Sequence, residues 1–150
     1  MRKTLLAAFC TLAMVGTAQS EVIGSIATTW RMVGANDKIS VERFDDPKVT
    51  NASCYVSYAQ TGGLTGYIGL AEDPSRFSIA CRATGPVSIT QNIPSEFEEV
   101  FSRSTSILFK EMRVSRMLDT DKNVLVYLVW STKLIDGSPF NSVTAIPVDR

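Results

Sequence analysis

The chain has 150 residues, of which 45% are hydrophobic and 20% charged, and its 15 Lys and Arg balance its 15 Asp and Glu. This composition is typical of one ordinary globular domain and gives no clustered positive charge for nucleic acid. The sequence contains no histidine, which excludes Ser-His-Asp and Cys-His nucleophile systems and histidine-containing zinc or haem sites. We therefore expect no cofactor, no metal site and no nucleic-acid partner.

Residues 1–20 have the features of a secretory signal peptide. A basic pair precedes an apolar segment, residues 5–15, which is too short to span a bilayer. Small side chains at Ala18 and Ser20 predict cleavage before Glu21, with cleavage after Ala18 as the alternative. We expect a periplasmic protein with no stable membrane span once this segment is removed. The other interpretation is an amphipathic or buried N-terminal helix.

Removal of the signal would leave two cysteines, Cys54 and Cys81, because Cys10 lies within it. An even number of cysteines in an oxidising compartment predicts a disulfide between them. Two unpaired thiols in a core are the alternative. A redox couple is less favoured, since the C-x-x-C spacing is absent.

The remainder, residues 21–150, is expected to form a single β-rich domain with short strands and frequent turns. Strands are predicted at 39–44, 54–58, 77–82, 87–89, 107–118, 124–130 and 143–148, and residues 97–108 as strand or irregular. Residues 124–130 are apolar on both faces, which indicates a central strand, and Pro147 suits an edge strand. Alternation places both cysteines inward. The pattern predicts an antiparallel β-sandwich or small barrel.

Several segments resemble the CreA family of small exported bacterial proteins, from Ile23 to Pro147. The matching segments are Phe44-Asp45-Asp46-Pro47, Cys54-Tyr55-Val56-Ser57, Thr61-Gly62-Gly63, Gly69-Leu70-Ala71-Glu72-Asp73, Cys81, Gly85-Pro86, Leu108-Phe109-Lys110, Gly137-Ser138-Pro139 and Asn141. The resemblance implies a periplasmic location and the Cys54–Cys81 pairing. The resemblance implies no enzymatic activity, cofactor or catalytic residue.

The glycine-rich connector from Thr61 to Asp73 is the predicted binding loop. It is longer than a connection between two neighbouring strands requires, and its glycines expose bare backbone. Neither phosphate-loop motif fits its spacing. The alternative is a pair of bulges or sharp bends. The candidate residues are Gly62, Gly63, Gly66, Gly69, Glu72 and Asp73.

Most charged and aromatic side chains are expected to be structural. The acidic pairs at 45–46 and 72–73 are typical of solvated turns, although carboxylates can also bind Ca²⁺ or act as acid and base. A basic stripe between Arg103 and Arg116 is typical of a solvated face, with capture of an anionic ligand as the alternative. Trp30 and the tyrosines are expected in the core or half-buried in a sheet.

The functional expectation is a non-enzymatic periplasmic binding or accessory domain whose partner is a small molecule or an envelope protein. No catalytic residue is assigned. One alternative is a histidine-free hydrolase built on carboxylates, which a cleft at Glu72 or Asp73 would favour. The other is an envelope assembly or protein-interaction module, which an exposed apolar patch would favour.

Overall fold

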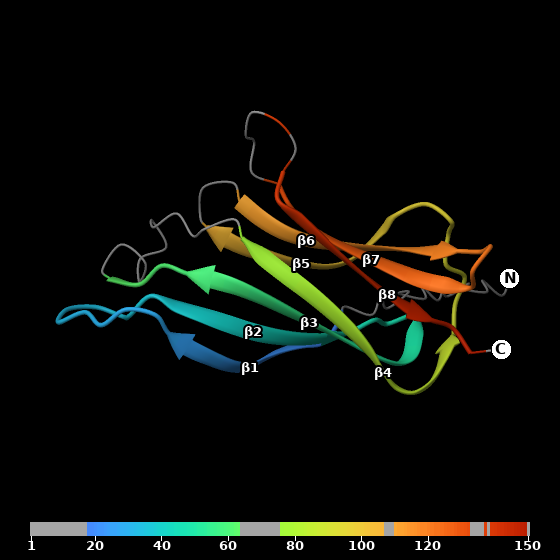
Figure 1. Ribbon diagram of the computed structural model, residues 1–150, viewed down its shortest axis with the longest axis horizontal. Helices are drawn as coiled ribbons and strands as arrows, with labels where there is room; N and C mark the ends of the chain where they lie inside the picture. Colours follow the sequence, from blue (N-terminus) through green and yellow to red (C-terminus); the bar gives the residue numbers. More distant parts are fainter. Residues whose placement is uncertain (1–17, 64–75, 107–109, 133–136, 138, 150) are drawn as a thin grey trace, which may run out of the picture.

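The computed structural model describes residues 18–63, 76–106, 110–132, 137 and 139–149, which form two four-stranded antiparallel sheets (Figure 1). The first sheet has the strand order β1 (Ser20–Ala27), β2 (Lys38–Asp45), β3 (Val49–Gln60) and β4 (Phe77–Ile89). The second has the order β5 (Glu98–Ser106), β6 (Lys110–Asp119), β7 (Val124–Ser131) and β8 (Asn141–Pro147). Each strand pairs with its sequence neighbours in its own sheet, which is a meander topology. The predicted antiparallel, mostly β fold is confirmed.

The two sheets come together along β4 and β8, which lie side by side. The opposite borders are the edge strands β1 and β5. No residue in the described part of the chain belongs to a helix with the length and hydropathy needed to cross a membrane.

Period-two alternation fills the space between the sheets with apolar side chains. Every second residue of β7, from Leu125 to Val129, is completely buried, and β3 follows the same pattern. Phe44 of β2 stacks on Phe101 of β5, with ring centroids 4.6 Å apart, and this contact joins the two sheets. The core therefore lies between the sheets, as the alternation predicts.

The structure confirms several predicted strands and changes others. β7 lies inside its sheet and β8, which ends at Pro147, lies at the edge, as predicted. Residues 87–89 are not a separate strand, because β4 runs without interruption from Phe77 to Ile89. The side chain of Asn51 supports this continuity by donating to the Pro86 carbonyl over 2.7 Å, where β3 has a register shift.

β1 was not predicted from the sequence, and it differs from the other strands. All eight of its residues are exposed, although it pairs with β2 along its length apart from a register shift between Val22 and Gly24. A strand that buries no residue has no hydrophobic alternation to reveal it. Only the pairing register identifies it.

Candidate functional site

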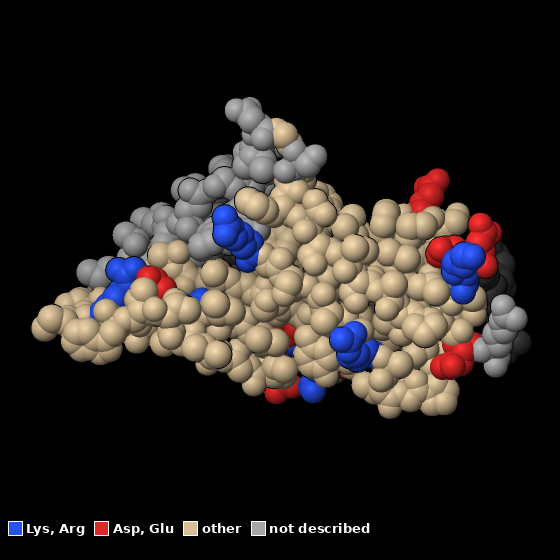
Figure 2. Space-filling model, viewed as in Figure 1, with Lys and Arg blue, Asp and Glu red and all other residues tan. Residues whose placement is uncertain are grey.

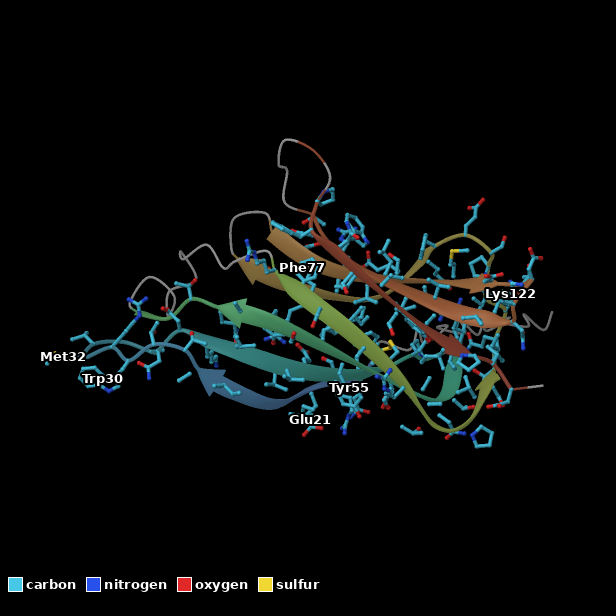
Figure 3. All side chains as sticks on the ribbon, viewed as in Figure 1. Glu21, Trp30, Met32, Tyr55, Phe77 and Lys122 are labelled. Carbon is cyan, nitrogen blue, oxygen red and sulfur yellow. A yellow bond between two sulfur atoms is a disulfide. The ribbon has the colours of Figure 1, made fainter. Side chains whose placement is uncertain are left out.

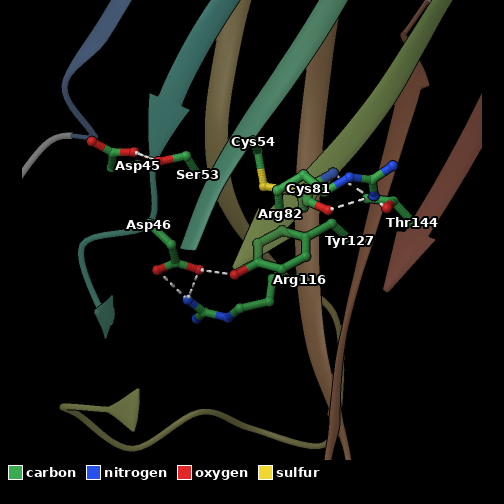
Figure 4. Close-up of a disulfide and its surroundings, with 9 residues drawn as sticks. All are labelled: Asp45, Asp46, Ser53, Cys54, Cys81, Arg82, Arg116, Tyr127 and Thr144. Carbon is green, nitrogen blue, oxygen red and sulfur yellow. Dashed lines mark hydrogen bonds and ion pairs between the residues drawn. A yellow bond between two sulfur atoms is a disulfide. The ribbon is translucent and has the colours of Figure 1, made fainter. Parts of the chain in front are cut away.

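The disulfide joins β3 to β4, which is an edge strand of the first sheet. Cys54 of β3 and Cys81 of β4 are directly opposite each other, with their Cα atoms 4.0 Å apart, and both are 1% exposed (Figure 4). The predicted pairing and the inward direction of both side chains are confirmed. The bond closes a loop with a sequence separation of 27, for which the chain-entropy model gives about 3.5 kcal/mol of stabilisation.

A buried ion pair lies next to the disulfide. Asp46 directly follows β2, and its two carboxylate oxygens each accept a hydrogen bond of 2.6 Å from Nη1 of Arg116 on β6 (Figure 4). Both side chains are completely buried. The hydroxyl of Tyr127 also donates to Asp46 over 3.0 Å. Burial, together with the Asp46 charge, raises the pKa of the Tyr127 hydroxyl far above its usual range, so this tyrosine stays protonated.

Glu98 of β5 extends this network toward the surface. Nη2 of Arg116 donates to one carboxylate oxygen of Glu98, and Nζ of Lys48 donates to both oxygens over 2.6 and 2.9 Å. The hydrogen bond from Lys48 is the main cause of the lowered pKa of Glu98, and the charge of Arg116 adds to it. Glu98 is therefore ionised at neutral pH. One carboxylate here is held by two cations.

The guanidinium of Arg116 keeps one unused donor. Its Nε is buried, and no hydrogen-bond partner for it is present among the described residues. A buried donor without a partner costs on the order of 1–3 kcal/mol. Such a donor is a place where a ligand oxygen would be stabilising.

A cleft of about 510 Å³ opens over this network. Its walls come from the residues just before and at the start of β1, the turn after β2, and β5. The lining residues are Ala18, Ser20, Pro47, Lys48, Glu98, Glu99, Val100, Phe101, Ser102 and Arg116. The cleft thus combines two cations, two acids and an apolar wall. A hollow of about 620 Å³ beside Trp130 is lined by six residues, none of them charged, and so offers less to a polar ligand.

A second buried carboxylate holds the same pair of sheets together. Glu42 of β2 is 2% exposed and accepts hydrogen bonds from Arg103 of β5 and from the Tyr58 hydroxyl at 3.0 Å. The guanidinium of Arg103 also lies 4.9 Å from the centre of the Tyr58 ring. This pair does not line the cleft, so its role is structural.

Two expectations about charge are corrected by these contacts. Asp46 is not in a solvated turn and Arg116 is not on a solvated face, because each satisfies the other in the interior. Strand parity contained the signal: Asp46 has the parity of buried Phe44, and Arg116 that of buried Met112 and Val114. The composition and the alternation of charges along the chain favoured exposed positions for Asp46 and Arg116, and this expectation was wrong.

Only part of the predicted binding loop can be placed. Gly62 and Gly63 pack against the connection between β1 and β2, where the Gly63 amide donates to the Ala35 carbonyl over 2.6 Å. Gly62 must lack a side chain, since a Cβ would lie 2.0 Å from that same oxygen. Gly66, Gly69, Glu72 and Asp73 lie outside the described residues. Their role in binding stays a prediction.

Comparison with known proteins matches this chain to one protein family. Residues 23–150 match the family described as CreA protein. The chain is 45% identical to Protein CreA of Escherichia coli K12 over 141 residues, covering 91% of this chain and 90% of the relative. The same identity and coverage hold for the proteins of that name in the O6:H1 and O157:H7 strains. No solved structure matches the chain.

Proposed function

The chain belongs to the CreA family, and we propose that it is an exported, non-enzymatic binding protein whose cleft takes a small molecule carrying a carboxylate. The observation that carries this proposal is the environment of Glu98. Its carboxylate lies between Lys48 and Arg116, so the cleft is built to hold a carboxylate. A ligand carboxylate would take the same place when the partly exposed Glu98 side chain rotates away.

The unpartnered Nε of Arg116 supports the same ligand chemistry. Arginine offers several donors in one plane, which suits the two oxygens of a carboxylate. Asp46 occupies Nη1, and Nη2 reaches Glu98, so Nε is the donor that a second oxygen would use. A ligand that supplies this oxygen removes the cost of the buried, unsatisfied group.

The apolar wall of the cleft restricts which kinds of ligand can fit. Pro47, Val100 and Phe101 are among its lining residues, and its volume lies in the range of ordinary small-molecule sites. A short carboxylic acid with an apolar body fits these walls. A highly charged anion does not, since Glu98 and Glu99 also line the cleft.

Export is supported by the sequence features of residues 1–20 and by the disulfide. It also bears on the cleft, because Ala18 and Ser20 form part of the lining. Cleavage before Glu21 removes both residues and widens the entrance. The processed protein is therefore the form that binds.

The proposal is tested by removing the internal carboxylate and supplying an external one. In Glu98→Ala protein, the ammonium of Lys48 and the guanidinium of Arg116 lose their shared partner. Acetate or propionate should then raise the melting temperature of the variant in proportion to the logarithm of ligand concentration. Glu111→Ala is the matched control, because Glu111 is a partly exposed glutamate that pairs with Arg113 and does not line the cleft.

Two results would overturn the proposal. One is an equal response of Glu98→Ala and Glu111→Ala protein to both acids. The other comes from mass spectrometry of the small molecules released on denaturing protein isolated from the producing cells. We expect an enriched carboxylic acid that is reduced in Arg116→Met protein, and an enriched compound without a carboxylate would contradict the assignment.

The carboxylate-based hydrolase gains no support from the described residues. A general acid needs a pKa raised toward neutrality, whereas the pKa of Glu98 is lowered by Lys48. Glu72 and Asp73, the other candidates, lie outside the described residues.

A further inference from the structure

Exposed apolar side chains are concentrated in one element of the molecule, the β1–β2 hairpin, residues 20–45. Ten large hydrophobic side chains are exposed among the described residues, and seven of them are in this hairpin. They are Val22, Ile23, Ile26, Trp30, Met32, Val33 and Ile39. Trp30, expected to be packed, is 78% exposed, and Met32 is 86% exposed. An exposed patch of this kind marks an interaction surface.

The hairpin tip, defined as Trp30 to Val33, projects away from the body of the protein. Trp30 and Met32 lie at the extremity of the connection between β1 and β2, at the left of Figure 3. In Figure 2 this extremity is uncharged, and basic and acidic atoms lie together next to it, toward the body of the protein. The tip is convex, so its apolar side chains do not cover one another.

Polar contacts fix the backbone that carries the tip. Nη2 of Arg31 donates to both carboxylate oxygens of Asp37 over 2.9 Å, and the Arg31 amide donates to the Asn36 side chain over 2.8 Å. Asp37 also accepts from the Gly62 amide over 2.7 Å, and this bond is the main cause of its lowered pKa. The apolar side chains are thus held in an exposed position by a network that does not include them.

We propose that the hairpin tip inserts into the interfacial region of a phospholipid bilayer and docks the protein on a membrane surface. A bilayer is a fluid surface that accepts a convex apolar tip without a complementary groove. Tryptophan is favoured at the level of the lipid headgroups. Ile26 and Ile39, a cross-strand pair behind the tip, widen the apolar area that would meet the lipid.

The charges of the tip are compatible with this partner. Arg31 is paired with Asp37, so insertion leaves no unmatched charge at the tip. Lys38 follows at the start of β2 and gives residues 28–39 a net charge of +1. That charge complements anionic headgroups. A few apolar side chains with one extra cation give reversible binding at the surface of the bilayer.

The test uses vesicles of phosphatidylethanolamine containing a minority of phosphatidylglycerol. Protein with the Trp130→Phe substitution retains Trp30 as the only tryptophan. Its fluorescence should shift to shorter wavelength on addition of vesicles and should be quenched by brominated lipid chains. In co-sedimentation, Trp30→Ser and Met32→Ser together should lower vesicle binding by about tenfold or more, from the lost apolar transfer energy.

The control is Val143→Ser, which removes a side chain that is 62% exposed but lies on β8, outside the hairpin. Its vesicle binding should equal that of the unchanged protein, and all variants should keep the same melting temperature. Equal binding by the tip variant and the control would overturn the proposal. So would an absence of vesicle binding, or self-association that the tip substitutions abolish without lipid, which would identify a second copy as the occupant.

Discussion

Arg116 connects two carboxylates of different exposure, and this position explains both its structural and its proposed ligand-binding role. Asp46 is completely buried, whereas Glu98 is 36% exposed. Moving a charge out of water is costly, so a buried arginine needs a matched anion. The inner carboxylate satisfies that need permanently. In the proposed function, a ligand carboxylate takes the place of the outer one.

The first prediction concerns the inner pair. Asp46→Asn should lower the free energy of unfolding by about 3–5 kcal/mol, because the charge of Arg116 would stay buried without its anion. Urea denaturation at neutral pH measures this difference. Glu21→Gln is the control: it breaks an exposed pair with Arg43 and should cost less than about 1 kcal/mol.

If Asp46→Asn protein does not fold, Tyr127→Phe tests the same network more gently. It removes one hydrogen bond of 3.0 Å to Asp46 and should cost about 1 kcal/mol. An unchanged free energy of unfolding in both variants would contradict the importance of the buried pair.

The second prediction concerns the outer carboxylate. The folded-state pKa of Glu98 lies below the ordinary value of 4.5, so its stabilising effect is complete above that pH. The effect is lost as the pH falls through the lowered pKa. Glu98→Gln should therefore remove part of the loss of stability below pH 4.5. Solvent screens this exposed group, so we expect at most about 1 kcal/mol at neutral pH.

Denaturation series at neutral and acidic pH distinguish this effect. The unchanged protein should lose more stability on acidification than Glu98→Gln protein does. Parallel curves for the two proteins would show that Lys48 and Arg116 do not stabilise the ionised carboxylate.

At the scale of the elements, the two sheets are joined differently along their two sides. β4 and β8 come together on one side, where the disulfide joins β4 to β3. Toward the other side, β2 meets β5 and β6 through buried ion pairs as well as the Phe44–Phe101 stack. β1 extends beyond this contact and covers none of the core. The exposed edge is therefore where both proposed interactions occur.

The third prediction tests how the hairpin is held. Gly62→Ala would place a Cβ 2.0 Å from the Ala35 carbonyl, so the connection between β1 and β2 must move away. We expect faster hydrogen exchange at the Gly63 amide, which donates to that carbonyl, and a loss of about 1–3 kcal/mol from overpacking. Gly24→Ala is the control, because nothing lies within 4 Å of its Cβ position. Similar exchange in both variants would contradict the close packing.

At the scale of the whole molecule, the cleft and the hairpin tip lie at opposite ends of β1. In the unprocessed chain, Ser20 at the start of the strand lines the cleft, and the tip follows the last residue of the strand, Ala27. A membrane bound at the tip would therefore leave the cleft accessible. The two proposed interactions can occur together in one molecule.

The fourth prediction concerns processing of the whole chain. Protein from a periplasmic extract should have the mass of a chain beginning at Glu21, or at Gln19 if cleavage follows Ala18. Thiol labelling of the denatured, unreduced protein should give no label, because Cys54 and Cys81 are bonded and Cys10 is removed with the signal. A mass that retains residues 1–20 would contradict export.

Much of the fold could be predicted because one face of most strands is buried. Alternation in β3 and in the first part of β4 identifies these strands and their inward residues, including the two cysteines, and a continuous apolar run identifies β7. β1 was not predicted, because neither of its faces is buried and its sequence therefore shows no alternation. Asp46 and Arg116 were expected at the surface because they are charged, whereas both are buried.

The sequence by itself determined the fold class, the disulfide pair and membership of the CreA family, since these follow from local alternation, two cysteines and residue identity. Tertiary structure decided which charged side chains pair in the interior and which apolar side chains stay exposed. Asp46 and Arg116 are 70 residues apart in the chain, and only the packing of the two sheets against each other brings them together. Trp30 and Met32 are exposed because the hairpin extends past the end of the second sheet. The position of that end is not encoded in the local sequence pattern of the hairpin.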